Sequence, residues 1–130
     1  MIKLRSLVFV LLASFSSMLL ADSGQNKTAY LHLQPAIIGN FISDGPKLKV
    51  FKADISLRVT SNTIDRVEYH APLIRDQLVL LFSQQTDDSF ATVEAKEELR
   101  REALKRVQTV LEREESEILV QDLLFNNLIP

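Results

Sequence analysis

The sequence predicts an α+β fold, in which a small, mostly antiparallel sheet is covered by two to three helices. Residues 47–59 alternate apolar and polar side chains, with the period of two that is typical of a strand with one solvent-exposed face. Two later stretches, residues 72–82 and 92–110, carry apolar side chains at helical spacing. The apolar run at residues 118–125 predicts a closing strand, so two or three N-terminal strands and one C-terminal strand form the sheet.

The composition is that of one small globular domain. Of the 130 residues, 46% are hydrophobic and 25% are charged, which excludes a disordered or collagen-like chain. The absence of cysteine excludes disulfides, a thiol nucleophile and a cysteine-ligated metal. With 15 basic and 17 acidic residues the net charge is -2, which provides no general attraction for nucleic acid.

The beginning of the chain has the features of a secretory signal. Lys3 and Arg5 precede an uncharged, largely apolar run at residues 6–21, which ends in the small residue Ala21. As a helix this run would span about 24 Å, against roughly 30 Å for the hydrocarbon core of a bilayer. The run is therefore either a cleaved signal peptide or a short membrane anchor.

Both alternatives divide the chain in the same way. Residues 1–21 are the signal or anchor, residues 22–28 form a polar linker, and residues 29–130 form the domain. Because positive charge stays on the cytoplasmic side of a membrane, the domain is expected outside the cytoplasm.

The first strands are short and are followed by a turn. Residues 30–35 form a β-like run that ends at Pro35, and the apolar residues 36–42 follow. Residues 43–46 carry a turn signal, in which Gly45 is free to take positive φ.

The long strand contains one irregularity in its pattern. From Phe51 to Val59 the apolar side chains occupy odd-numbered positions, whereas Leu48 and Val50 are even-numbered. A one-residue slip would place these two on the solvent face, so the pattern predicts a bulge or bend near Val50.

The first helical segments begin with capping and first-turn residues. Asn62 or Thr63 is expected to cap the first helix, and Pro72 suits the first turn of the next. The helix after Pro72 carries a buried stripe of Ile74, Leu78, Leu81 and Phe82. Leu73, Val79 and Leu80 widen this stripe, so that helix is expected to be covered on more than one side.

Thr92 is expected to cap the last helix by accepting a hydrogen bond from an unpaired backbone N–H. The pairs Glu97–Arg101 and Glu102–Arg106 are spaced to interact on its solvent face. Its buried stripe is Ala95, Leu99, Ala103, Val107 and Val110.

The sequence predicts no catalytic residue, no metal site and no cofactor. His32 and His70, the two histidines, have no second ligand at metal-binding spacing. His32 alternates with apolar neighbours as a solvent-facing strand residue would, and His70 stands where a helix ends. Asp87 and Asp88 are adjacent in a polar segment, where carboxylates are usually solvated.

Five segments carry a resemblance to a known family. Pro72, Arg75 and Asp76 lead the second helix, and residues 96–100 open the last one. Their order and spacing, together with residues 33–35, 37–41 and 120–125, resemble the extracytoplasmic domain of the flagellar basal-body-associated FliL family over about residues 29–126.

This resemblance implies a stomatin-like fold and a non-enzymatic role in the flagellar motor. Members of the family associate with stator units in the periplasm and form rings around the stator stem. The implied partners are therefore stator or basal-body proteins and further copies of the chain, with no nucleic acid. The implied location is the periplasm, or the inner membrane through residues 6–21 with the domain facing the periplasm.

Two other function classes stay open at the level of sequence. One is an envelope scaffold with the same fold and a non-flagellar partner, and the other is an enzyme or small-ligand carrier.

The chain departs from the family pattern by its short signal-like run in place of a full membrane helix, and by Ala95 where glycine is frequent.

The candidate partner-binding residues are Arg75, Asp76 and Arg100. Arg75 and Asp76 stand beside Pro72 in an otherwise mostly apolar helix. One interpretation is structural, with Arg75 bonding carbonyls or carboxylates and Asp76 complementing the helix dipole. The other, taken from the resemblance, is that this helix end faces a neighbouring copy or the stator stem.

We expect cleavage after Ala21, so that the mature protein begins at Asp22 and is released from cells by osmotic shock. N-terminal sequencing and intact mass measure this directly. A full-length mass confined to the membrane fraction would show a retained anchor.

Overall fold

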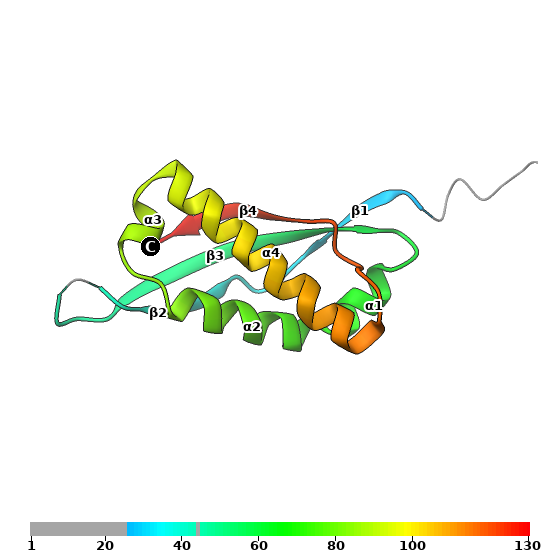
Figure 1. Cartoon of the computed structure of the whole chain (residues 1–130), viewed down its shortest axis with the longest axis horizontal. Coiled ribbons are helices and arrows are strands. Elements are labelled where there is room, and N and C mark those ends of the chain that lie inside the picture. The colour runs from blue at the N-terminus through cyan, green and yellow to red at the C-terminus, as the bar shows by residue number, and fades with distance from the viewer. Residues whose placement is uncertain (1–25, 44) are drawn as a thin grey trace, which may run out of the picture.

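The long strand β3 (Lys49–Thr60) organises the sheet, because every other strand pairs with it in antiparallel register (Figure 1). The structure is a computed structural model and describes residues 26–43 and 45–130. β1 (Thr28–His32) and β2 (Ile37–Phe41) follow one another along one edge of β3. β4 (Asp122–Ile129) occupies the opposite edge.

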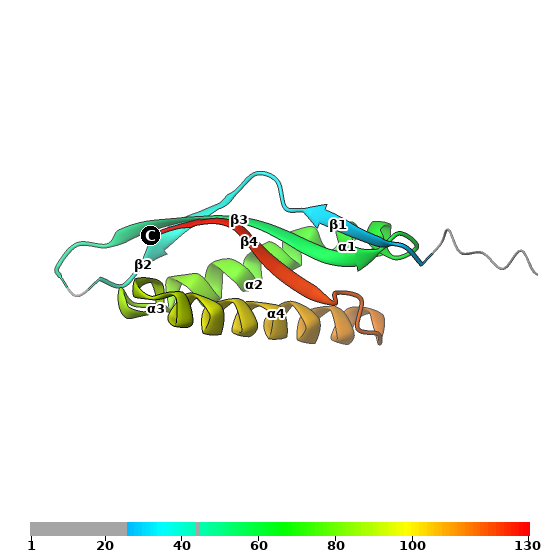
Figure 2. The same cartoon turned by 90° about the horizontal axis from the view of Figure 1, so that it is seen from above.

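Figure 2 shows α2, α3 and α4 on one face of this sheet, and α1 contacts β1, β3 and α2. α1 (Ile64–Tyr69) and α2 (Ala71–Ser83) follow β3 directly, and α2 packs against β2. After the short α3 (Asp88–Ala91), the long α4 (Val93–Glu115) packs against α2 and β4. The predicted α+β class, with an antiparallel sheet and a C-terminal strand, is confirmed.

The core lies between β3 and the two long helices. The odd-numbered apolar residues of β3 are fully buried, as the alternation predicts. The ring of Phe51 contacts that of Phe82 from α2 with 5.2 Å between centroids, and Phe41 contacts Phe90 at 4.8 Å. The predicted stripe of α2 is buried (Ile74, Leu78, Leu81 and Phe82), and so is that of α4 from Leu99 onward (Leu99, Ala103, Val107 and Val110, joined by Leu111). Ala95, predicted as the first member of the α4 stripe, is only half-buried.

Gly39 is required by the packing of the Phe51 ring. The two residues are cross-strand partners in the pairing of β2 with β3. A Cβ atom on Gly39 would lie 2.8 Å from two carbons of that ring, closer than carbon atoms pack. Glycine here lets a large aromatic side chain lie flat over β2.

The predicted bulge near Val50 is wrong. Residues Lys49 to Ala53 pair with β2 in regular register, so Leu48 and Val50 keep their phase and are exposed. The irregularity lies instead on β4, where Asn126 is the extra residue between the positions opposite Asp54 and Ile55. Because of this bulge Leu128 faces the core again after Phe125.

Within residues 26–43 and 45–130, nothing covers the wider apolar stripe of α2 on a second side. Val79 is 37% exposed and Leu80 45% exposed, while Leu73 is half-buried. This side of α2 therefore faces solvent.

The helix and turn signals are confirmed in part. The hydroxyl of Thr92 accepts a hydrogen bond from the Ala95 N–H at 3.0 Å, as predicted. Thr63 occupies the N-cap of α1 but makes no capping bond with its side chain. Gly45 does not take positive φ, and the last strand starts at Asp122 rather than at residue 118.

The predicted signal or anchor at residues 1–21 lies outside the described residues. Within the described ranges, no helix is both long enough and apolar enough to cross a membrane.

Leu78→Ala is expected to lower the free energy of unfolding by about 2 to 5 kcal/mol, because it empties a fully buried position between α2 and the sheet. Leu80→Ala is the matched control on the solvent side of the same helix and is expected to stay within about 0.5 kcal/mol. Urea unfolding of both variants measures the difference. Equal losses would contradict the orientation of α2.

Candidate partner-binding site

Arg100 fastens α4 to the beginning of β4. Its Nε and Nη2 donate to the Glu97 carboxylate at 2.8 and 2.6 Å, and its Nη1 donates to Asp122 Oδ1 at 2.6 Å. Nη1 also donates to the Leu123 carbonyl at 3.0 Å. The planar guanidinium suits such divergent acceptors better than an ammonium does. Hydrogen bonds with Glu97 and then Asp122, opposed by burial, raise the pKa of Arg100. The hydrogen bond from Arg100, opposed by burial, lowers the pKa of Glu97.

Arg75 fastens α2 to the opposite edge of the sheet. Its Nη1 donates to the carbonyl of Pro35 at 2.6 Å, in the connection between β1 and β2. Asp76 beside it is exposed. The pair Arg75–Asp76 and the side chain of Arg100 therefore belong to different edges, and the structure does not bring the three predicted residues together. Their role in partner binding stays a prediction.

A third charged cluster, which the sequence did not indicate, joins α1 to the end of α4. Arg66 donates to Glu115 at 2.9 Å and pairs with Glu117 at 2.9 Å, while His70 Nε2 lies 2.8 Å from Glu115 Oε1. These contacts join residues more than 40 positions apart in the chain, which periodicity does not reveal. Hydrogen bonds from Arg66 and then His70 lower the pKa of Glu115. His70 lies between α1 and α2, in agreement with a helix-end position.

His32 lies on the uncovered face of the sheet, as predicted for a solvent-facing strand residue. Its Nδ1 lies 2.8 Å from Ser56 Oγ, and the Asn126 amide donates to that hydroxyl at 2.6 Å. This is a polar cluster across β1, β3 and β4 rather than a ligand set. Among the described residues, no group of three or more His, Asp and Glu side chains could hold a metal ion.

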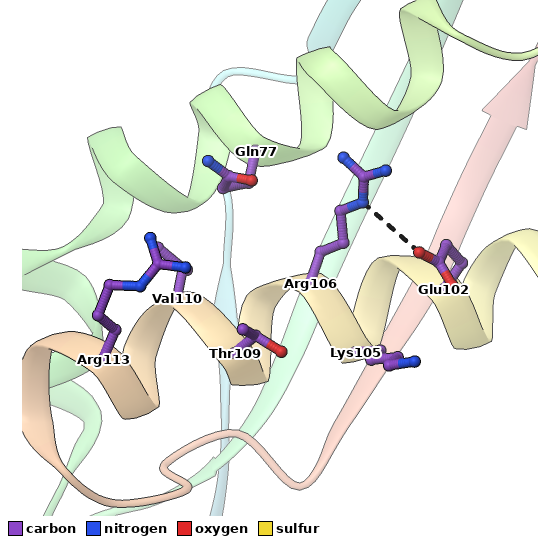
Figure 3. A pocket seen from close by; sticks show the side chains of 7 residues that line it. All are labelled: Gln77, Glu102, Lys105, Arg106, Thr109, Val110 and Arg113. Carbon is purple, nitrogen blue, oxygen red and sulfur yellow. Dashed lines mark ion pairs between the residues drawn. The ribbon is translucent and has the colours of Figure 1, made fainter.

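A shallow cleft of about 280 Å³ runs between α2 and α4 (Figure 3). Gln77 lines it from α2, and α4 contributes Arg106, which pairs with Glu102 at 3.5 Å and donates to Gln84 at 3.4 Å. The predicted pair Glu97–Arg101 is likewise present at 3.5 Å. The surface of α4 is therefore of mixed charge, as predicted, and the cleft is open to solvent.

A larger groove of about 460 Å³ lies between the first turns of α4 and the edge strand β4. Val93, Lys96 and Arg100 line it from α4, and residues 124–128 line it from β4. Val93 is 80% exposed, so the wall of this groove includes an apolar side chain without cover. Sequence reasoning missed the groove because it expected the last strand to start and end too early.

Comparison with known proteins covers nearly all of this sheet-and-helix unit. The sequence model of the family described as "Flagellar basal body-associated protein FliL" matches residues 30–129, from β1 to the last residue of β4. The chain belongs to the FliL family. The resemblance found in its helix starts and strand order is therefore confirmed.

One relative of this FliL chain is "Flagellar protein FliL" of Aquifex aeolicus (strain VF5). The two are 32% identical over 81 residues, which make up 61% of this chain and 49% of the relative. The chain thus spans about half the length of this curated relative in the matched region.

Glu115→Gln is expected to make the melting temperature depend less on pH in the acidic range. Because Arg66 and His70 lower the pKa of Glu115 from its ordinary 4.5, the unfolded chain binds this proton more readily. The carboxylate's contribution is therefore present above about pH 4.5 and is lost as the pH falls through the lower, folded-state pKa.

Melting temperatures at pH 7 and pH 3 measure this effect. Glu115→Gln is expected to melt below the parent protein at pH 7 and close to it at pH 3. Glu114→Gln, at an exposed neighbouring position, is the matched control and is expected to follow the parent at both values. A constant deficit for Glu115→Gln at both pH values would show that its charge plays no part.

Proposed function

We propose that this FliL protein is a non-enzymatic accessory protein of the bacterial flagellar motor, which contacts stator units in the periplasm and supports motility. The observation that carries the proposal is the family match, which extends over the sheet and the helices together rather than over a fragment of them. A motor accessory protein works by holding other proteins, so its surface and rigidity matter more than a reactive group.

The polar contacts of the structure support a holding role. Three arginines are engaged within the fold: Arg100 joins α4 to β4, Arg75 joins α2 to the strand connection, and Arg66 joins α1 to α4. Each contact ties a helix to a distant part of the chain. These contacts hold the exposed faces of the domain in a fixed geometry. A rigid binding surface loses less conformational entropy when it binds another protein.

The proposed location is the periplasm, with residues 1–21 directing export or holding the domain at the inner membrane. The proposed partners are stator units and further copies of the chain arranged as a ring. In this proposal Arg75, Asp76 and Arg100 contribute to these contacts, Arg75 and Asp76 from one edge of the sheet and Arg100 from the other.

Deletion of the gene and complementation in the source organism test the role in the motor. We expect reduced spreading in soft agar with flagella still assembled, and chemical cross-links between the protein and stator subunits in isolated membranes. Normal spreading, together with cross-links to other envelope proteins only, would favour the alternative of a scaffold with a non-flagellar partner.

Arg75→Lys tests the predicted interface directly. An ammonium still reaches one carbonyl, but it cannot reproduce a planar contact to a partner. We expect a melting temperature within a few degrees of the parent, with reduced cross-linking and reduced swarming. Arg101→Lys, on the exposed face of α4, is the control and is expected to swarm normally. An Arg75→Lys variant that folds, cross-links and swarms normally would remove Arg75 from the interface.

A further inference from the structure

The edge of β4 beside α4 carries backbone groups that the fold leaves without a partner. In an antiparallel strand, alternate residues direct their N–H and C=O groups to opposite edges. The Ile55 carbonyl accepts from the Leu33 N–H at 2.9 Å, on the side of β1 and β2. The Arg58 carbonyl accepts from the Gln121 N–H at 2.9 Å, on the side of β4. Ser56, two residues from Arg58, therefore also faces β4.

This alternation determines which residues of β4 face outward. Leu124 is opposite Ser56 and Asn127 is opposite Asp54, so these two direct their backbone groups toward β3. Phe125 and Leu128 then direct theirs away from the sheet. Leu123 also faces outward, at the end where β4 begins.

The outward groups of Leu123 are already bonded, which fixes where the open edge starts. Its N–H donates to Asp122 Oδ1 at 2.8 Å, and its carbonyl accepts from Arg100 at 3.0 Å. Within the described part of the chain, the outward groups of Phe125 and Leu128 have no such partner. Arg100 and Asp122 thus close one end of the edge and leave the rest of it available.

The strand itself has few of the features that protect an edge from pairing. Apart from Asp122 at its start, β4 carries no charged residue and no proline. The opposite edge differs, since Pro35 interrupts it between β1 and β2. The bulge at Asn126 bends β4 but leaves outward groups on both sides of it.

The groove beside this edge indicates what kind of segment fits. Val93 and the half-buried Phe125 provide apolar contacts, and Lys96 provides a positive charge. Glu97, the acid beside it, is engaged by Arg100 and Arg101, whereas Lys96 takes part in no ion pair among the described residues. An acidic side chain entering the groove would therefore find a complementary charge without breaking an existing pair.

We propose that β4 and the first turns of α4 form a strand-addition site, which takes an extended segment of a partner protein with alternate apolar residues and an acidic residue facing Lys96. The segment pairs with the outward backbone groups of Phe125 and Leu128, and its side chains pack against Val93. Arg100 holds the end of the strand in place and so positions the site. The proposal deepens the function proposed above and rests on it only for the identity of the partner.

The test uses the full chain produced in its source organism under conditions of motility. The photo-cross-linking amino acid p-benzoyl-L-phenylalanine replaces Val93 in the groove, or Val50 on the uncovered sheet face as a matched control site. Mass spectrometry then identifies the cross-linked peptide. We expect a peptide with alternate apolar residues and an acidic residue from a single partner protein at position 93, and no such adduct at position 50.

Two variants separate strand addition from side-chain packing. Leu128→Pro and Leu128→Ala both remove the half-buried side chain, but only proline removes the outward N–H. We expect the Val93 adduct to fall about tenfold in Leu128→Pro relative to Leu128→Ala, as the loss of one edge hydrogen bond would produce. Melting temperatures show whether both variants are folded. If Leu128→Pro melts much lower than the parent protein, Leu128→Ala is compared with the parent, and its adduct at position 93 is expected to persist.

Several outcomes would overturn the proposal. These are equal adduct yields in two folded variants, loss of the adduct in Leu128→Ala, no adduct at position 93, or a cross-link at position 93 to a second copy of this chain. A strand-dependent adduct with a protein outside the motor would sustain the site and refute the proposed function. Impaired swarming on gene deletion without any adduct at position 93 would support the proposed function and refute the strand-addition site.

Discussion

The structure depends on the burial of one face of β3. Its alternate residues from Phe51 to Val59 are fully buried, and the neighbouring strands cannot cover them because they lie beside β3 in the same sheet. Only apolar helix stripes laid across that face remove them from water, so α2 and α4 must lie on the same side of the sheet. Burial of this face also determines the path of β4, because in a regular strand Asn127 would face the core after Phe125, whereas the bulge at Asn126 turns Leu128 to the core instead. Within the described part of the chain, α2 and α4 leave the other face of the sheet uncovered.

Regular periodicity made much of this fold predictable. The alternation in β3, the stripes of α2 and α4 and the Thr92 cap are local patterns, and each was found where the sequence indicated it. The change of phase at Leu48 and Val50 in β3 did not indicate a bulge, because both residues lie on the solvent face of a regular strand. The bulge lies on β4, where the pattern of β3 gives no information. Val79 and Leu80 led to the wrong prediction that α2 is covered on a second side, since apolar residues on a helix need not all be buried.

The sequence indicated single residues of the candidate site but not the contacts that they make. Arg75 and Arg100 were identified from their positions in helix starts, but their contacts with Pro35 and Asp122 join segments that only the fold brings together. The cluster of Arg66, His70 and Glu115 and the groove between α4 and β4 gave no local signal at all. In each case the missing information was tertiary: which helix crosses which strand, and where the edge of the sheet lies.

Amide hydrogen exchange along β4 tests the central claim most directly, namely that this strand is paired with β3 on one edge only and is open on the other. In the purified protein, the amides of Leu124 and Asn127 are expected to exchange slowly, because they bond to β3. The amides of Phe125 and Leu128 are expected to exchange much faster, because they face solvent. Residue-resolved exchange measured by NMR distinguishes the four positions. Uniformly slow exchange along β4 would show that the edge is already covered, and uniformly fast exchange would show that β4 is not part of the sheet; either result would contradict the account.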